Sequence, residues 1–358
     1  MTKARTNASA SPAVGRNMVI NGAMNVAQRG TSETGIGSTG GYFTCDRWKI
    51  GTSSHAGQFT MSQTADGPNG ISANCIKLDC TTADTSIAAG EALSIQQRFE
   101  GQNLQRIGKG VAGAQQITVS FYVKASAAFT FGCELLDIDN SRQVTKLFNT
   151  TTDWNRIELT FPADVDDGSS PFDDDNASSL RLSFHLHAGS NFTSGTLNTA
   201  AFANRTDANR AVGIDSFFSS TDNNFFLTGV QMEVGPVATE FEQEDISTTL
   251  AKCQRYFQLS SGMLAVAAST TQVNSSFNLP TVMRAAPTMG KDGSDIQFGD
   301  MVSYGDATSN TPVLTDYLYK ERAIAFHVTG LSSMTQYRTY RHEPNGSNTG
   351  RITLDAEL

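Results

Sequence analysis

The densest cluster of possible metal ligands is an acidic segment at residues 164–176. The aspartates that could supply oxygen ligands there are Asp164, Asp166, Asp167, Asp173, Asp174 and Asp175. Calcium takes about six to eight oxygen ligands, which a flexible acidic loop can provide. An EF-hand is excluded, because Gly168 stands at a ligand position and Asp175 stands where a glutamate is required. The segment therefore predicts a loop calcium site or a solvated acidic loop, and no other cofactor is indicated.

A histidine pair is the second possible metal site. His185 and His187 are separated by one residue in a stretch of alternating polarity. Because alternate side chains of a β-strand lie on one face, both imidazoles are expected to point the same way. That arrangement permits a transition-metal pair. No cysteine or third histidine is close in sequence, so the alternative is an exposed polar face.

The sequence carries no recognised catalytic pattern. A Gly-x-Ser-x-Gly elbow, a His-Glu-x-x-His zinc helix and a phosphate-binding glycine loop are all missing from it. A glycoside hydrolase needs a pair of carboxylates placed across a sugar. No pattern singles out such a pair among the 35 acidic residues. We therefore expect that the chain is not an enzyme.

Aromatic and cationic residues near the C-terminus form a candidate binding site. Such a cluster combines aromatic platforms with polar groups, as sugar-binding surfaces do. Its members are Tyr317, Tyr319, Tyr337, Arg338, Tyr340, Arg341 and His342. The alternative is that these residues pack in a core or at an interface. The two tryptophans, Trp48 and Trp154, lie at strand positions and are expected in a core or at a domain edge.

Composition limits the classes of protein that fit. The chain has 358 residues, of which 39% are hydrophobic and 17% charged, and 31 are glycine. This length favours two domains, and abundant small polar residues favour strands joined by tight turns. The cysteines are widely spaced and are expected to be buried free thiols. They are Cys45, Cys75, Cys80, Cys133 and Cys253.

Charge and hydropathy argue against two kinds of partner. The formal net charge is −9, which disfavours nucleic-acid binding and adhesion to anionic membranes. No apolar run approaches the roughly 18 residues that span a bilayer, so membrane insertion is not expected. The first six residues carry positive charge without an apolar stretch behind them. We therefore expect no signal peptide and synthesis in a cytoplasm.

Alternating hydrophobicity predicts a series of strands in the first two thirds of the chain. The predicted strands are 48–51, 58–63, 75–79, 93–99, 116–124, 129–137, 143–148, 154–161, 179–187 and 225–234. An interrupted opening strand at 17–26 and a short helix near 102–107 are also expected. Local turns without long helices predict an antiparallel sandwich of jelly-roll type. The segments 31–41 and 188–213, rich in small residues, are expected to be functional or mobile loops.

The remaining sequence predicts a helix and a second β domain. Leu250, Cys253 and Phe257 share a helical face after the capping residue Ser247, which predicts a helix at 246–257. The strands predicted beyond it are 263–268, 272–279, 288–290, 296–298, 323–328, 336–340 and 351–356.

The expected fold class is therefore all-β. It comprises a jelly-roll-type β-sandwich at 17–244, a linking helix at 245–257 and a smaller β-sandwich domain at 258–358. Residues 1–16 contain few large apolar side chains and cannot fold alone. They are expected to be a flexible attachment tail that a partner would order; the alternative is a free linker.

Three stretches resemble bacteriophage tail fibre and related virion appendage proteins that carry a carbohydrate-binding-module-like β-sandwich. The first runs from Asn17 to Gly30 and is followed by Asp46-Arg47-Trp48. The second is the closing strand 225–234 with the Cys-Gln-Arg-Tyr-Phe run at 253–257. The third is the proline-bounded link at 278–288. The resemblance is strongest in the first two stretches.

The resemblance implies a structural, non-enzymatic virion appendage subunit, such as a tail fibre or tail-tip protein, that forms a homotrimer. Its N-terminus, with Lys3 and Arg5, would attach to other tail or baseplate proteins. Exposed loops would bind a host surface polysaccharide or lipopolysaccharide, and several copies on one virion would add avidity. Two alternatives stay open: a purely structural capsid or baseplate decoration protein, and a polysaccharide depolymerase tailspike.

Overall fold

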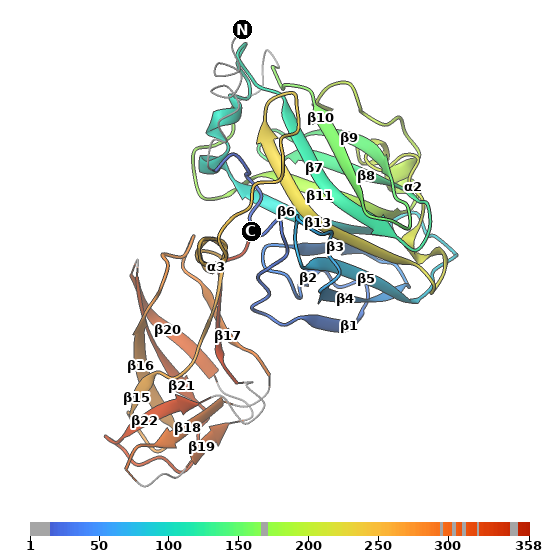
Figure 1. Cartoon of the computed structure of the whole chain (residues 1–358). Coiled ribbons are helices and arrows are strands. Elements are labelled where there is room, and N and C mark those ends of the chain that lie inside the picture. The colour runs from blue at the N-terminus through green and yellow to red at the C-terminus, as the bar shows by residue number, and fades with distance from the viewer. Residues whose placement is uncertain are drawn as a thin grey trace. The chain divides into compact units, whose positions relative to one another are not determined.

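The structure is a computed structural model that describes residues 15–165, 171–293, 296–302, 306–309, 313–320, 322–343 and 350–358. For 306–309 and 313–318 the description is confined to the backbone. The chain divides into two compact units, Met1–Ile246 and Ser247–Leu358. Strands make up nearly all the regular structure of both (Figure 1), which confirms the all-β prediction.

The first unit contains a six-stranded and a seven-stranded antiparallel sheet. The six-stranded sheet has the order β1 (Ser32–Ile36), β4 (Gln58–Thr64), β5 (Cys75–Thr82), β13 (Asn224–Val234), β7 (Ile117–Ala125) and β10 (Asn155–Phe161). The seven-stranded sheet has the order β12 (Ala203–Asn204), β9 (Arg142–Asn149), β8 (Thr130–Asp137), β11 (Ser178–Ala188), β6 (Ala92–Glu100), β3 (Lys49–Ser53) and β2 (Gly41–Tyr42). Chain neighbours are often not sheet neighbours, as expected for a jelly-roll-type sandwich.

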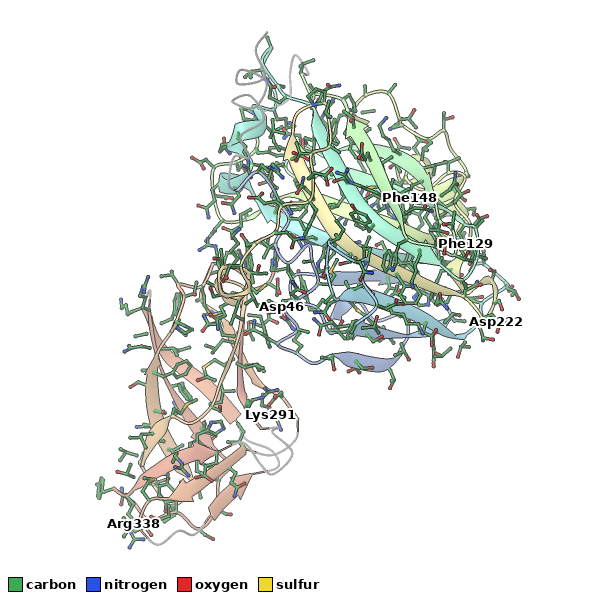
Figure 2. All side chains as sticks on the ribbon, viewed as in Figure 1. Asp46, Phe129, Phe148, Asp222, Lys291 and Arg338 are labelled. Carbon is green, nitrogen blue, oxygen red and sulfur yellow. The ribbon has the colours of Figure 1, made fainter. Side chains whose placement is uncertain are left out.

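The two sheets enclose one hydrophobic core. Phe121 from β7 and Phe184 from β11 meet edge to face with ring centroids 4.9 Å apart, which ties one sheet to the other. Phe148 packs against both rings and lies among the strands of this unit (Figure 2). Trp48 is fully buried beside Phe184, which confirms its expected place in a core. All five cysteines are buried free thiols, as predicted.

The strands predicted between residues 48 and 234 are all present and differ only at their ends. Three short strands were not predicted, namely β1, β2 and β12. The residues of β1 are mostly exposed, so its sequence lacks the alternation that marks a half-buried strand. The helix expected near 102–107 consists of two 3₁₀ turns, η1 (Gly101–Asn103) and η2 (Gln105–Ile107).

The opening strand predicted at 17–26 is wrong, because the structure assigns no strand there. Asn21 and Met24 have φ angles of 58° and 57°, which turn the chain back on itself. The turn is attached to β13, since the amide of Val230 donates to the carbonyl of Gly22 at 3.0 Å. A Cβ atom added to Gly22 would lie only 2.1 Å from the backbone carbonyl oxygen of Val230. Glycine is therefore required for close packing rather than for a hairpin.

The loop expected at 188–213 contains short helical elements. They are α2 (Ser190–Thr193) and η3 (Asp207–Asn209), and η4 (Phe217–Ser219) follows. The segment folds back onto its sheet, because the amide of Thr145 in β9 donates to the carbonyl of Asn198 at 2.8 Å. This contact brings the loop close to the outer face of the seven-stranded sheet.

The boundary between the units falls at the first residue of helix α3 (Ile246–Gln254). This helix ends earlier than the predicted 257 because Phe257 already belongs to a strand. A three-stranded sheet has the order β14 (Phe257–Ser260), β23 (Ile352–Asp355) and β17 (Thr288–Lys291). A seven-stranded sheet has the order β19 (Asp306–Ser309), β18 (Ile296–Asp300), β22 (Thr339–Glu343), β15 (Leu264–Ala267), β16 (Gln272–Asn278), β21 (Ala323–Thr329) and β20 (Val313–Lys320).

One core joins the two sheets of the second unit. Ile352 and Leu354 from β23 cluster with Ile324 and Phe326 from β21. The predicted second β-sandwich is therefore confirmed. Strands β14, β19 and β20 were not predicted; β14 begins at Phe257, the last residue of the predicted helix, and β19 contains no large apolar residue.

Candidate functional site

The outer face of the seven-stranded sheet in the first unit is lined with polar side chains. Strand β11 buries Leu180, Leu182, Phe184 and Leu186 in the core. The residues between them, Arg181, Ser183 and His185, therefore lie on the opposite face. Strand β6 follows the same alternation: Leu93 and Ile95 belong to the core. Its residues Ser94, Gln96 and Arg98 belong to the outer face.

Strand register arranges these side chains in rows across the sheet. In one row Lys49, Gln96, Ser183 and Glu134 are successive cross-strand partners. In the next row the successive partners are Gly51, Ser94, His185 and Gly132. In the second row a glycine flanks Ser94 and His185 on each side. Because glycine has no side chain, little projects from the sheet there. A hollow between taller side chains follows from this register.

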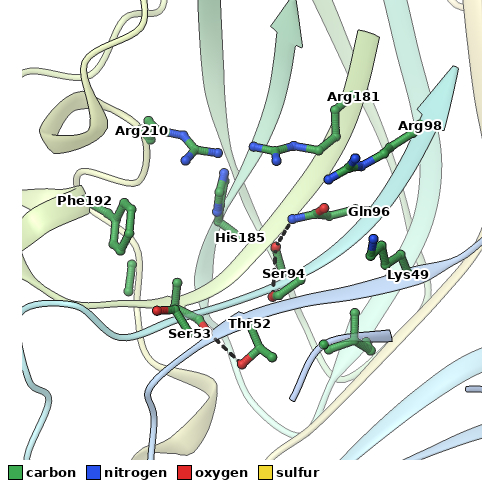
Figure 3. A pocket seen from close by; sticks show the side chains of 15 residues that line it. Lys49, Thr52, Ser53, Ser94, Gln96, Arg98, Arg181, His185, Phe192 and Arg210 are labelled. Carbon is green, nitrogen blue, oxygen red and sulfur yellow. Dashed lines mark hydrogen bonds between the residues drawn. The ribbon is translucent and has the colours of Figure 1, made fainter. Parts of the chain in front are cut away.

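The loop after β11 closes one side of the hollow. It contributes Phe192 from α2 and Arg210, whose guanidinium carbon lies 6.0 Å from the centre of the Phe192 ring. The resulting pocket has a volume of about 340 Å³. Figure 3 shows the side chains that line it, among them Lys49, Gln96, Arg98, Arg181, His185 and Arg210.

A buried carboxylate, Glu134, lies beneath the pocket. Arg210 donates from Nε and Nη2 to its two oxygens at 2.7 Å each, and Nε2 of His185 lies 3.2 Å away. Burial raises the pKa of Glu134, but hydrogen bonds from Arg210 and the charge around it outweigh burial. The pKa of Glu134 therefore lies well below its usual value, and the side chain is an anion at neutral pH.

Two arginines of the pocket are not neutralised in the same way. Nη2 of Arg181 lies 3.5 Å from Glu134, and Arg98 has no carboxylate partner among the described residues. The Nε atoms of both are buried without a hydrogen-bond partner within the described parts of the chain. Burial lowers the pKa of Arg181 to about 10, although Glu134 opposes the shift; Arg210 and Arg98 add to it. The pocket therefore holds excess positive charge.

The pocket continues into a second hollow of about 200 Å³, which Arg98 and Arg181 also line. Arg205 and Ser141 line it as well. We refer to the two hollows together as the basic groove. Its neutral hydrogen-bonding groups include Gln96, which donates to the hydroxyl of Ser94 at 2.7 Å. The groove can therefore bind a ligand that carries both hydroxyls and negative charge.

The histidine pair does not form a joint site. A register shift between His185 and His187 separates their environments. His187 lies 2.8 Å from the hydroxyl of Ser216 through Nδ1 and 3.1 Å from Glu91 through Nε2. A serine, a histidine and a carboxylate linked in this order resemble the catalytic triad of a serine hydrolase. However, His187 is fully buried, and the Ser216 hydroxyl caps η4 by accepting from the amide of Phe218. The contacts among His187, Ser216 and Glu91 therefore stabilise the fold.

The acidic segment is split between two environments. Asp164 is buried and accepts from Nε and Nη2 of Arg142 at 3.0 and 2.9 Å, so cations already neutralise it. Asp173, Asp174 and Asp175 are exposed, whereas Asp166 and Asp167 lie outside the described residues. Within the described ranges no group of three or more His, Cys, Asp or Glu side chains could hold a metal ion. Calcium binding by this segment stays a prediction.

The tyrosine and arginine cluster is divided by the alternation of β22. Tyr340 and His342 are buried, which removes them from any receptor surface. The Tyr340 hydroxyl accepts from the amide of Thr335 at 2.9 Å, and Nε2 of His342 lies 2.8 Å from the Gly350 carbonyl. Both side chains therefore serve the core of the second unit.

The rest of the cluster does not form one platform. Tyr337 is 81% exposed, Arg341 pairs with Glu343, and Arg338, labelled in Figure 2, pairs with Asp300 at 2.7 Å. The hydroxyl of Tyr319 donates to the Met283 carbonyl at 3.2 Å. The side chain of Tyr317 lies outside the description.

The proposed attachment residues Lys3 and Arg5 also lie outside the described residues. The description begins at Gly15, whose amide donates to Glu242 at 2.5 Å. The amide of Asn17 donates to the other oxygen of the same carboxylate at 2.9 Å. The start of the described chain is thus held against residues that follow the closing strand.

Sequence reasoning did not single out the basic groove. The predicted strands 93–99 and 179–187 contain Arg98 and Arg181. The missing information was that these strands are neighbours, since the residues are 83 positions apart but form a direct cross-strand pair. Trp154, the other tryptophan, is half-buried on the six-stranded sheet, where its ring packs against Phe226 and Lys124.

Comparisons with known proteins give fold-level similarities. No model of a protein family matches the chain, and no curated protein sequence does. Among solved structures, TmCBM61 in complex with β-1,4-galactotriose is 8% identical, with a TM-score of 0.31 over 62% of this chain and 99% of its own. A family 11 carbohydrate-binding module from Clostridium thermocellum in complex with a β-1,3-1,4-mixed-linked tetrasaccharide is 11% identical, with a TM-score of 0.28 over 59% and 99%. A family 30 carbohydrate-binding module is 10% identical, with a TM-score of 0.30 over 65% and 93%.

None of the helices in the described part of the chain has the length and apolarity needed to cross a membrane.

Proposed function

We propose that this chain is a non-catalytic subunit of a bacteriophage virion appendage, a tail fibre or tail-tip protein, that binds a host surface glycan in the basic groove. The observation that carries the binding role is the pocket of about 340 Å³ on a rigid sheet. This volume lies within the range of about 300–1,000 Å³ that small-molecule sites occupy. Strand register, rather than a mobile loop, positions most of its polar groups.

The chemistry of the pocket suits a sugar. Gln96, Ser94 and Thr52 offer amide and hydroxyl groups, and Phe192 offers an aromatic ring. Sugar sites combine such hydrogen-bonding groups with aromatic surface. The trio of His187, Ser216 and Glu91 offers no competing catalytic site, because its histidine is fully buried and has no access to substrate. The ligand would be a host polysaccharide or lipopolysaccharide.

The virion role rests on the sequence resemblance. The N-terminal residues 1–16 would attach the subunit to tail or baseplate proteins, and three copies would form a homotrimer with the avidity of linked sites. An antibody against the second unit should label the appendages of purified particles. Labelling of the capsid instead would favour the decoration protein.

Binding to purified host polysaccharide and lipopolysaccharide tests the proposed ligand. The wild-type protein should bind one of them, and the double variant Lys49→Ala/Gln96→Ala should lose at least tenfold in affinity with an unchanged thermal unfolding profile. Lys320→Ala, an exposed lysine in the second unit, is the matched control and should bind as the wild type does.

Two results would overturn the proposal. A folded wild-type protein that binds neither preparation nor any glycan on an array would favour a purely structural role. Shortened polysaccharide chains after incubation would favour the depolymerase.

A further inference from the structure

We infer that the basic groove takes an acidic saccharide, whose anionic group lies between Arg98 and Arg181. This inference rests on the proposed glycan binding and names the class of glycan. Arg98 and Arg181 are direct cross-strand partners on β6 and β11. Like charges in such a pair repel each other and destabilise the sheet. An anion bound between them would turn that repulsion into attraction.

The second observation is unmet hydrogen-bonding capacity. Nε of Arg98 and Nε of Arg181 are buried without a partner within the described ranges. A buried donor without an acceptor costs about 1–3 kcal/mol. Carboxylate, sulfate and phosphate are acceptors that match the planar guanidinium group with paired hydrogen bonds.

The third observation is local charge. The cations that line the two hollows are Lys49, Arg98, Arg181, Arg205 and Arg210. Among the described residues the lining carboxylate is Asp137, which already pairs with Lys109 at 2.9 Å. Asp207 pairs with Arg205 at 3.0 Å and with Arg210 at 3.4 Å. Glu134 is shared by Arg210, Arg181 and His185, so the cations still outnumber the carboxylates around the groove. This positive field stands in a chain with a formal net charge of −9. An isolated basic region of this kind attracts anions locally.

The surroundings select a saccharide among anionic ligands. Gln96, Ser94 and Phe192 suit a ring that carries hydroxyls. A long phosphate backbone would meet the repulsion of the acidic remainder of the chain. The two hollows of about 340 and 200 Å³ share Arg98 and Arg181, so the anionic group would lie at their junction with neutral sugar on one side.

A glycan array tests the inference on the intact protein. It should carry uronate, sialate, sulfated and phosphorylated oligosaccharides, each beside its uncharged parent. The acidic member of at least one pair should bind tenfold or more tightly than its parent, and the preferred group identifies the anion. Arg98→Gln and Arg181→Gln should each remove most of this difference, while Arg98→Lys retains part of it. Arg322→Gln, at an exposed arginine of the second unit, is the matched control.

Thermal unfolding gives a readout that needs no complete ligand. Sodium glucuronate should raise the Tm of the wild type above that in sodium chloride of equal ionic strength. Arg98→Gln should unfold at a higher temperature than the wild type without added glucuronate, because it removes a like-charge pair, and should respond less to the salt. Equal binding of acidic and neutral glycans, with no effect of Arg98→Gln, would overturn the inference and leave the proposed function intact. Absence of all glycan binding would overturn the proposed function as well.

Discussion

Asn21, which lies in one of the stretches that carry the virion resemblance, stabilises the fold through its side-chain hydrogen bonds. Its side-chain amide donates to the carbonyls of Val26 and Asp46 at 2.8 and 3.0 Å, and its oxygen accepts from the amide of Val26 at 3.0 Å. Nε1 of Trp48 donates to the Asn21 carbonyl at 3.1 Å. The motif residues therefore hold segments of the first unit together, and the groove is built from other residues.

The burial of His187 predicts how the free energy of unfolding changes with pH. Burial lowers the pKa of His187 below its ordinary value, against the opposing effect of Glu91, and burial also lowers the pKa of neighbouring His55. The unfolded chain therefore binds more protons than the folded chain below about pH 6.5. The stability that the two neutral histidines contribute is present above this pH. It is lost as the pH falls toward their pKa values in the folded state.

The measurement is the free energy of unfolding of the wild type and of His187→Gln at pH 7.5 and pH 5.5. The wild type should lose more stability between the two than the variant does, because Gln does not titrate. His327→Gln, in the second unit, is the control. An equal loss in wild type and His187→Gln would show that His187 does not contribute to the pH dependence.

At the scale of elements, alternation of hydrophobic residues predicted strands well where one face is buried. Strand β11 is an example, since its apolar and polar residues alternate from Leu180 to Leu186. Alternation could not predict the 17–26 turn, because its structure depends on hydrogen bonds to Asp46 and Val230, which are distant in sequence. It also could not predict the groove, because a row across a sheet exists only once register is known.

The turn at residues 20–26 should depend on the Asn21 side chain rather than on its φ angle alone. Asn21→Gly keeps the positive φ accessible but removes all three side-chain hydrogen bonds. We expect a loss of about 2–4 kcal/mol in the free energy of unfolding of the first unit, because buried backbone groups lose their partners. Asn69→Gly, at an exposed asparagine, is the control. A loss in Asn21→Gly no larger than that of the control would contradict this role.

At the scale of the whole molecule, each unit has its own hydrophobic core between two sheets, and the groove lies on the first unit. The first encloses two large sheets and supports the groove, and the second encloses a three-stranded and a seven-stranded sheet. Two residues of the candidate binding cluster in the second unit, Tyr340 and His342, are buried inside that unit. Glycan binding is thus expected to depend on the first unit.

Separate cores predict that the two units unfold as separate cooperative steps. Phe184 in the first core and Phe326 in the second are both fully buried, so they form a matched pair for substitution. Phe→Ala in a core costs about 3–5 kcal/mol. In calorimetry of the intact protein, Phe184→Ala should lower only one of two transitions and Phe326→Ala only the other. A glycan that binds the groove should raise only the transition that Phe184→Ala lowers, because ligand stabilises the unit that binds it. A single transition that both substitutions shift together would contradict the prediction, because it would mean that the units unfold as one.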